Sequence, residues 1–119
     1  MRFINLTRHR LNTEQIIAVK EMGAEGIVEP NNECKALCDC RELFEKEAYE
    51  ERAAKIAEML EMKEGDIIHV SGDPNILSAL NALASKINGK LMTSRMDKKS
   101  TIGDNFKHKF LGFVEIYKF

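Results

Sequence analysis

The segment Asp66-Ile67-Ile68-His69-Val70-Ser71-Gly72-Asp73-Pro74-Asn75 contains the clearest indication of fold in this chain. Its first five residues are mostly apolar, which is typical of a strand that is covered on both faces. A polar turn with a glycine follows, and apolar residues then recur at helical spacing, with Pro74 near the first helical turn. A buried strand that turns directly into a helix is typical of proteins in which strands and helices alternate.

The sequence on both sides of this segment predicts further units of the same kind. Strands are predicted over residues 2–6, 26–29, 66–70, 90–93 and 110–119, and helices over residues 15–22, 45–62 and 76–83. Residues 94–105 form a polar, basic stretch after the fourth strand. The last strand has no helix before it, so we expect it to lie antiparallel at an edge, with residues 106–108 as a candidate hairpin partner.

These elements predict a three-layer, Rossmann-like α/β sandwich. Its mostly parallel sheet is expected to have the strand order 2-1-3-4, with the antiparallel C-terminal strand at an edge. The predicted sheet core consists of Ile4, Leu6, Ile27, Ile67, Ile68, Val70, Leu91 and Val114.

The composition is that of a globular domain. The chain has 119 residues, of which 44% are hydrophobic and 31% charged. It has no apolar run of about 18 residues, which predicts that no helix crosses a membrane. The N-terminus lacks the pattern of a signal peptide, and three cysteines are too few for a secreted disulfide framework. We therefore expect a single cytoplasmic domain over residues 1–119.

Charge is distributed unevenly along the chain. Residues 21–66 carry 14 acids and 6 bases, whereas the residues before and after them are basic on balance. Such a chain is expected to have one acidic and one basic side. This arrangement fits an anionic ligand of modest size and argues against binding to long nucleic acid, for which a far more basic domain is expected.

Polar residues follow three of the predicted parallel strands. The three groups are Thr7-Arg8-His9, Ser71-Gly72-Asp73 and Thr93-Ser94-Arg95. Ligands of open α/β sheets bind beyond the carboxyl ends of the strands, so these groups form the candidate site. An arginine can bind a phosphate with two hydrogen bonds, which the nearby Lys98 cannot do.

Each group also has a simpler interpretation. The segment 71–75 is consistent with an ordinary strand-to-helix turn in which Ser71 or Asp73 caps the helix. The arginines and His9 are also consistent with solvated surface residues, and His69 with a buried strand histidine. Cys34, Cys38 and Cys40 have no fourth metal ligand nearby in the sequence, so we expect neither a metal site nor a cofactor.

The sequence also resembles a known family. Phe3-Ile4-Asn5-Leu6-Thr7-Arg8-His9, followed by Leu11-Asn12-Thr13-Glu14-Gln15, resembles the start of small CRISPR-associated proteins with a single CARF-like domain. These proteins belong to type III systems, and some of them are ring nucleases. Val70-Ser71-Gly72-Asp73, Thr93-Ser94-Arg95 and the strand over residues 110–117 extend the resemblance to nearly the whole chain.

The resemblance implies that the protein binds a cyclic oligoadenylate, with cyclic tetra-adenylate as the expected ring, and cleaves it without a metal. The ribose 2′-hydroxyl would attack the adjacent phosphate, leaving linear products with 2′,3′-cyclic phosphate ends and switching off type III CRISPR signalling. A homodimer is expected, because a two-fold axis can present the same crevice twice to one ring. Two alternatives are a sensor that binds the ring without cutting it and an unrelated nucleotide- or phosphate-binding protein.

On this interpretation the site residues fall into two groups. The expected catalytic residues are Arg95, Ser71, Thr7 and His9. The expected ligand-binding residues are Asn5, Arg8, Gly72, Asp73, Asn75, Thr93, Ser94 and Lys98.

Overall fold

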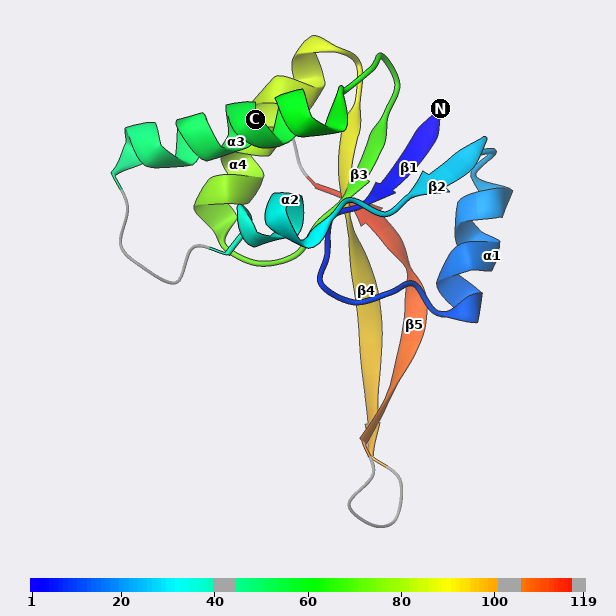
Figure 1. Ribbon diagram of the computed structural model, residues 1–119. Coiled ribbons are helices and arrows are strands. Elements are labelled where there is room, and N and C mark those ends of the chain that lie inside the picture. Colours follow the sequence, from blue (N-terminus) through cyan, green and yellow to red (C-terminus); the bar gives the residue numbers. More distant parts are fainter. Residues whose placement is uncertain (40–44, 101–105, 117–119) are drawn as a thin grey trace.

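The protein is an α/β structure with one five-stranded sheet (Figure 1). The computed structural model describes residues 1–39, 45–100 and 106–116, and within residues 97–100 and 106–109 it describes the backbone only. In chain order the elements are β1 (Arg2–Asn5), α1 (Thr13–Glu21), β2 (Gly26–Val28), α2 (Asn32–Ala36), α3 (Lys46–Leu60), β3 (Ile67–His69), α4 (Pro74–Lys86), β4 (Lys90–Ser100) and β5 (Phe106–Glu115).

The sheet is mostly parallel, as the alternating pattern predicted. Its strand order is β2-β1-β3-β4-β5, with parallel pairing from β2 to β4 and antiparallel pairing between β4 and β5. The four parallel strands therefore have the predicted order, and the C-terminal strand joins them as an antiparallel edge. Asn5, His69 and Met92 occupy neighbouring register positions near the carboxyl ends of β1, β3 and the parallel part of β4.

Helices pack on both faces of the sheet, because successive side chains of a strand point to opposite faces. On one face, Ile4 and Ile68 contribute to a core with residues of α2, α3 and α4. On the other face, Phe3 and Ile67 pack with Val19 of α1. Figure 1 shows α1 apart from the other three helices, on the opposite side of the sheet.

The first helix begins where the sequence indicated. The Asn12 side chain accepts a hydrogen bond from the Gln15 backbone N–H at 2.8 Å, and the Gln15 side chain accepts one from the Asn12 N–H at 2.9 Å. This reciprocal capping box satisfies two of the backbone donors that a helix N-terminus leaves open. It also fixes Gln15 at the start of α1, where its amide can reach the sheet.

The fourth strand is longer than predicted, because it includes residues 94–100 of the polar, basic stretch, whereas the predicted strand ended at residue 93. β4 continues to Ser100 because β5 pairs with it along its length. Antiparallel backbone hydrogen bonds keep the polar segment extended, although its composition favours a loop. Thr93, Ser94 and Arg95 therefore lie within a strand, and Figure 1 shows the β4–β5 hairpin projecting beyond the rest of the sheet.

Two residues of the predicted core are partly exposed. Ile27 is 37% exposed and Val114 is 41% exposed, whereas the other six predicted core residues are buried. Both lie on edge strands, β2 and β5, where a side chain has neighbours on one side only. The short helix α2 lies in a region for which no helix or strand was predicted.

Candidate functional site

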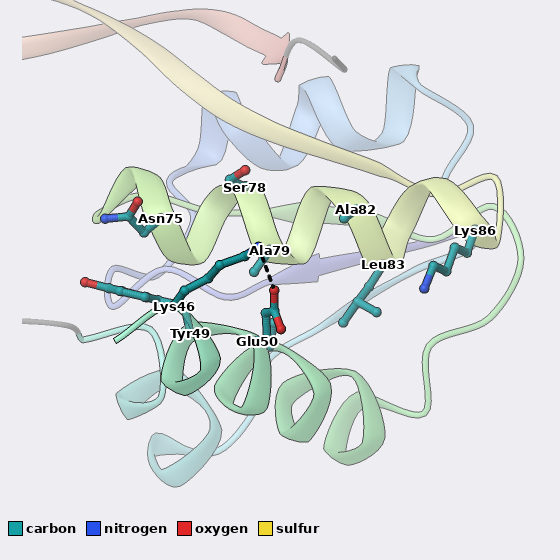
Figure 2. Close-up of a pocket in the computed structure, with 10 residues that line it drawn as sticks. Lys46, Tyr49, Glu50, Asn75, Ser78, Ala79, Ala82, Leu83 and Lys86 are labelled. Carbon is teal, nitrogen blue, oxygen red and sulfur yellow. Dashed lines mark ion pairs between the residues drawn. The ribbon is translucent and has the colours of Figure 1, made fainter. Parts of the chain in front are cut away.

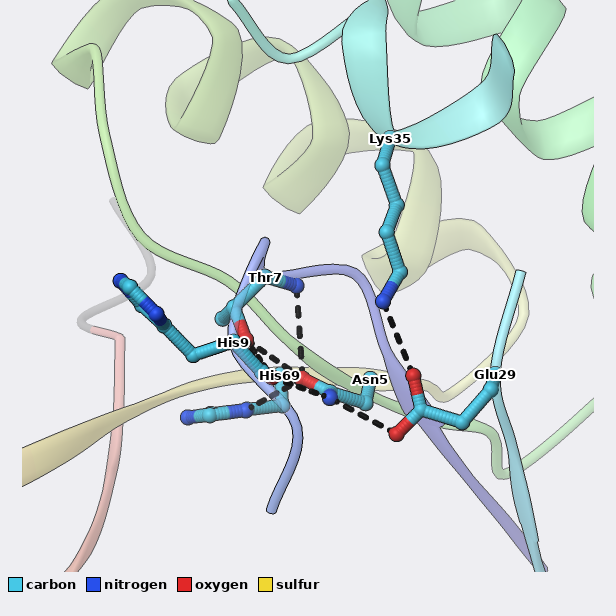
Figure 3. A network of polar contacts seen from close by, with 6 residues as sticks. All are labelled: Asn5, Thr7, His9, Glu29, Lys35 and His69. Atoms are coloured by element: carbon cyan, nitrogen blue, oxygen red, sulfur yellow. Dashed lines mark hydrogen bonds and ion pairs between the residues drawn. The ribbon is translucent and has the colours of Figure 1, made fainter. Parts of the chain in front are cut away.

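A buried network of hydrogen bonds crosses the carboxyl ends of the strands, with Asn5 at its centre (Figure 3). Asn5 is fully buried, and its Oδ1 accepts hydrogen bonds from Thr7 Oγ1 at 2.7 Å and His69 Nδ1 at 3.0 Å. Its Nδ2 donates to the carbonyl oxygen of His9 at 2.8 Å and to Glu29 Oε1 at 2.9 Å. One amide therefore ties β3, the segment after β1 and the residue after β2 together.

His69 continues this network towards β4 and α1. The histidine is 4% exposed, and burial lowers its pKa from 6.5 to about 4, while nearby Glu29 has a smaller opposing effect. The ring is therefore neutral at pH 7. Since Asn5 Oδ1 can only accept, Nδ1 carries the proton, and Nε2 accepts from Ser94 Oγ at 2.7 Å. Ser94 Oγ in turn accepts from Gln15 Nε2 at 3.0 Å.

The network fixes the backbone of the loop between β1 and α1. The His9 carbonyl accepts from Asn5 Nδ2 and lies 3.1 Å from Thr7 Oγ1, and the Leu6 N–H donates to the His69 carbonyl at 2.9 Å. His9 takes part in this network through its backbone carbonyl and not through its ring. The ring points away from the network in Figure 3, and the side chains of Arg8, His9 and Arg10 are exposed.

Two adjoining hollows lie next to this loop. The first, which we call the β3 hollow, has a volume of about 370 Å³, and the second, the β2 hollow, about 680 Å³. Arg8 and Lys35 line both. The β3 hollow is further lined by Leu6, Thr7, His9, Cys38, Asp39, Ser71, Gly72 and Asp73, and the β2 hollow by Arg10, Leu11, Ile16, Ile27, Glu29, Pro30 and Asn32.

Opposite charges meet along the rim of both hollows. The Arg8 guanidinium forms an ion pair with Asp39, and half of the Arg8 side chain stays exposed. Lys35 Nζ lies 2.9 Å from Glu29 Oε2, and Arg10 adds an exposed cation at the rim of the β2 hollow. A guanidinium has five N–H donors, so Arg8 can bind Asp39 and a phosphate at the same time.

The structure brings one group of predicted site residues together. Arg8, His9, Ser71, Gly72 and Asp73 all line the β3 hollow, and Thr7 lines it as well. Gly72 has a φ of +118°, a conformation that disfavours residues with a Cβ. Asp73 accepts a hydrogen bond from the Asn75 N–H at 2.8 Å and caps α4, as the simpler interpretation of this turn proposed.

Asn5 and Thr7 differ from these residues because they are buried. Thr7 is 6% exposed, and its hydroxyl donates to Asn5 Oδ1 and lies 3.1 Å from the His9 carbonyl. Their direct effect is to hold the loop that carries Arg8 and His9.

The other predicted site residues lie elsewhere. Asn75 lines a separate groove of about 870 Å³ between α3 and α4, together with Lys46, Tyr49 and Lys86 (Figure 2). Arg95 is exposed in β4 opposite Gly112, beside a β-bulge, and is not among the residues that line the β3 or β2 hollow.

Three predicted ligand residues share β4 with Arg95. Thr93 pairs with Val114, and Ser94 reaches the buried network through its hydroxyl. The backbone of Lys98 pairs with that of His108, and its side chain lies outside the described residues.

Three residues next to the candidate site were not predicted from the sequence, namely His69, Glu29 and Lys35. His69 was expected to be a buried strand histidine, and it is buried in β3. Its two polar partners could not be predicted, because they depend on strand register. Glu29 follows β2 directly, and an acidic residue directly after a predicted strand could have been recognised in the sequence as a candidate site residue. Lys35 lies on α2, which the sequence did not predict.

The cysteines form no metal site in the described part of the chain. Cys34 is buried, and its pKa is raised by burial and by the nearby charge of Glu33. Cys38 is half-buried, and Cys40 lies outside the described residues. Over these described ranges, no three His, Cys, Asp or Glu side chains cluster as metal ligands would, and no helix has the length and apolar character needed to cross a membrane.

The fold and the site together define an α/β protein with polar hollows at the carboxyl ends of a mostly parallel sheet. A family model described as "Uncharacterized protein MJ1673 family" matches residues 1–109. The chain therefore belongs to the MJ1673 family. No curated protein and no solved structure matches it.

Proposed function

We propose that this protein is a ring nuclease that binds a cyclic oligoadenylate and cuts it without a metal. The observation that carries the proposal is the β3 hollow, which gathers Arg8, His9, Ser71 and Gly72 after neighbouring parallel strands. Open α/β sheets bind ligands at this position. The resemblance of the opening segment 3–15 to CARF-like proteins supports the same ligand class, because Arg8 and His9 belong to that segment.

The proposed reaction is an internal attack within the substrate. The ribose 2′-oxygen forms a bond to the adjacent phosphorus, the bond from phosphorus to the 5′-oxygen breaks, and a 2′,3′-cyclic phosphate remains. The 2′-hydroxyl loses a proton and the departing 5′-oxygen gains one. Holding the attacking and leaving atoms in line and stabilising charge on the phosphate can account for most of the acceleration.

The exposed side chains of the β3 hollow supply these roles. We assign the phosphate contact to Arg8, whose guanidinium reaches the hollow from the fixed loop. His9 is the candidate for proton transfer, because imidazole is the side chain most often used for that purpose. Arg95, which the sequence favoured for the phosphate, lies in β4 outside the hollow.

The proposal includes a symmetric homodimer. Two copies related by a two-fold axis would present two β3 hollows to one cyclic tetra-adenylate. Light scattering with and without the ring measures this directly, and a monomer under both conditions would rule the dimer out.

One assay separates the proposed activity from its alternatives. The purified protein is incubated with cyclic tetra-adenylate in the presence of EDTA, and the products are resolved by chromatography. Linear products with 2′,3′-cyclic phosphate ends support a ring nuclease. Retention of the intact ring by the protein would instead mean a sensor, and the absence of both binding and cleavage would overturn the proposal.

A further inference from the structure

The β2 hollow places a carboxylate, two arginines and an apolar wall around one space. Glu29, the residue after β2, faces it together with Arg8, Arg10 and Lys35, while Ile16 and Ile27 form part of its wall. Its volume of about 680 Å³ lies within the range of small-molecule sites. The hollow adjoins the β3 hollow, since Arg8 and Lys35 line both.

Glu29 is held in a fixed position, and its carboxylate can still accept further hydrogen bonds. Its Oε1 accepts from Asn5 Nδ2 at 2.9 Å and its Oε2 from Lys35 Nζ at 2.9 Å, as Figure 3 shows. A carboxylate can accept about four hydrogen bonds, and the Glu29 side chain is 42% exposed. It can therefore accept a ligand hydroxyl, and Lys35 offsets its charge so that a nearby phosphate is repelled less.

The order of these groups along the sheet matches the parts of a ribonucleotide. In α/β folds that bind dinucleotides, the loop after the first strand holds the phosphate and an acid about 20 residues further on accepts a ribose hydroxyl. Here Arg8 and Arg10 lie on the loop after β1, and Glu29 follows β2. The glycines of those folds are absent from this loop, so the arginine side chains are the donors that it offers to a phosphate.

The apolar wall completes the site. Ile27 is 37% exposed on its edge strand, and Ile16 is half-buried on α1. The exposed isoleucine is an apolar surface on which a planar nucleobase can lie, next to a carboxylate and two arginines that can bind its polar groups. Burying such a surface under a base is favourable because it removes apolar area from water.

We propose that the β2 hollow binds one ribonucleotide unit. Its base lies against Ile16 and Ile27, its 2′-hydroxyl donates to Glu29, and its phosphate is bound by Arg10 with Arg8. The choice of a nucleotide as the ligand rests on the proposed function, because this hollow would hold one nucleotide of the ring. It predicts binding of a free mononucleotide as well, which can be measured without any cleavage.

The test is calorimetric titration of the protein with adenosine 5′-monophosphate and with its 2′-deoxy analogue. The ribonucleotide is expected to bind about tenfold more tightly, because the analogue lacks a hydrogen bond to a charged acceptor. Glu29→Gln is expected to reduce this preference to less than about twofold, since the neutral amide is a weaker acceptor. Equal binding of both nucleotides to the unmodified protein, or binding of neither, would overturn the inference.

A second pair of variants tests the hollow itself and keeps the result interpretable if Glu29→Gln folds poorly. Ile27→Asp is expected to abolish binding, whereas Ile17→Asp, at a 51% exposed isoleucine of α1 outside the hollow, is expected to leave it unchanged. Loss of binding in both variants, or in neither, would contradict the placement. Ring cleavage without a ribose preference would remove this inference alone, and a ribose preference without ring cleavage would remove the ring nuclease alone.

Discussion

His69 Nδ1 lies 3.0 Å from Asn5 Oδ1, and the two residues face each other in register on the neighbouring parallel strands β3 and β1. Both side chains are buried, so this contact replaces the water that either polar group would otherwise bind. The remaining Asn5 donors go to the His9 carbonyl and to Glu29. A single buried pair thus connects the sheet interior to the loop of the β3 hollow and to the carboxylate of the β2 hollow.

The first prediction is a loss of stability in mild acid. Burial lowers the pKa of His69 from 6.5 to about 4, so the unfolded chain takes up this proton more readily than the folded one. The contribution of neutral His69 to the free energy of unfolding is therefore complete above pH 6.5. It is lost as the pH falls towards 4, and it amounts to about 3 kcal/mol. Urea unfolding at several pH values between 7 and 4 measures it.

His69→Gln is the control for this prediction. Glutamine does not titrate, so the variant is expected to be less stable at pH 7 but to lose less stability between pH 6.5 and 4. An equally steep loss in the variant would assign the acid sensitivity to other groups.

The second prediction concerns the ion pair between Arg2 and Asp66. Arg2 Nη2 lies 2.5 Å from Asp66 Oδ2, and Asp66 is 2% exposed and also accepts from the Lys63 N–H. Hydrogen bonds from Arg2 and Lys63 hold the pKa of Asp66 below its usual value against the opposing effect of burial. Asp66→Ala is expected to cost about 3 kcal/mol, because it leaves the Arg2 guanidinium without its anionic partner and the Lys63 N–H without its acceptor. Thermal or urea unfolding measures this cost.

Glu50→Ala provides the comparison, since Glu50 pairs with Lys46 on an exposed surface of α3 at 3.9 Å. Exposed pairs contribute little, so this variant is expected to unfold like the unmodified protein. A similar loss in both variants would mean that burial of the Arg2–Asp66 pair is unimportant.

The sequence predicted the sheet because its signals are local. Two signals depend only on neighbouring residues: the apolar run at residues 66–70 and the alternation of strands and helices. Together they predicted a mostly parallel sheet. The length of β4 depends on pairing with β5, a contact between distant segments, and polar composition suggested a loop instead. For the same reason Thr93, Ser94 and Arg95 lie within a long strand instead of in a loop at the end of a short one.

The same limit applies to the site. Arg8, His9, Ser71 and Gly72, which line the β3 hollow, were predicted to lie together because they follow strands directly, a position visible in the sequence. The partnership of His69 with Asn5 and Ser94 was not visible, because it depends on strand register and on which face of each strand a side chain occupies. Lys35 was missed because α2 is too short to leave a periodic pattern.

The third prediction concerns Gly72, whose φ of +118° lies in a region that residues with a Cβ rarely adopt. Gly72→Ala is expected to reduce stability by about 1–3 kcal/mol through backbone strain and to weaken ring binding by deforming the β3 hollow. Denaturant unfolding and ring binding are measured together. Gly26→Ala, at an ordinary φ with no atom within 4 Å of the added Cβ, is expected to change neither. Unchanged stability in Gly72→Ala would refute the strain argument.

The fourth prediction separates the two arginines that sequence and structure favour for the phosphate. Arg8 lines the β3 hollow, whereas Arg95 is exposed on β4 and is not among the residues that line the hollow. If Arg8 stabilises charge that develops on the phosphate, Arg8→Ala is expected to lower the single-turnover cleavage rate on the order of 100-fold. Binding of the ring should weaken less, because the other contacts of the ground state remain.

Arg95→Ala is the matched control, since it removes the same charged group from an exposed position. It is expected to cleave the ring within about twofold of the unmodified rate, as a surface charge outside the hollow has only a screened effect. Single-turnover assays on both variants, with folding checked by circular dichroism, decide between the two positions. A large loss in Arg95→Ala with little change in Arg8→Ala would place the reacting phosphate on β4 instead of in the β3 hollow.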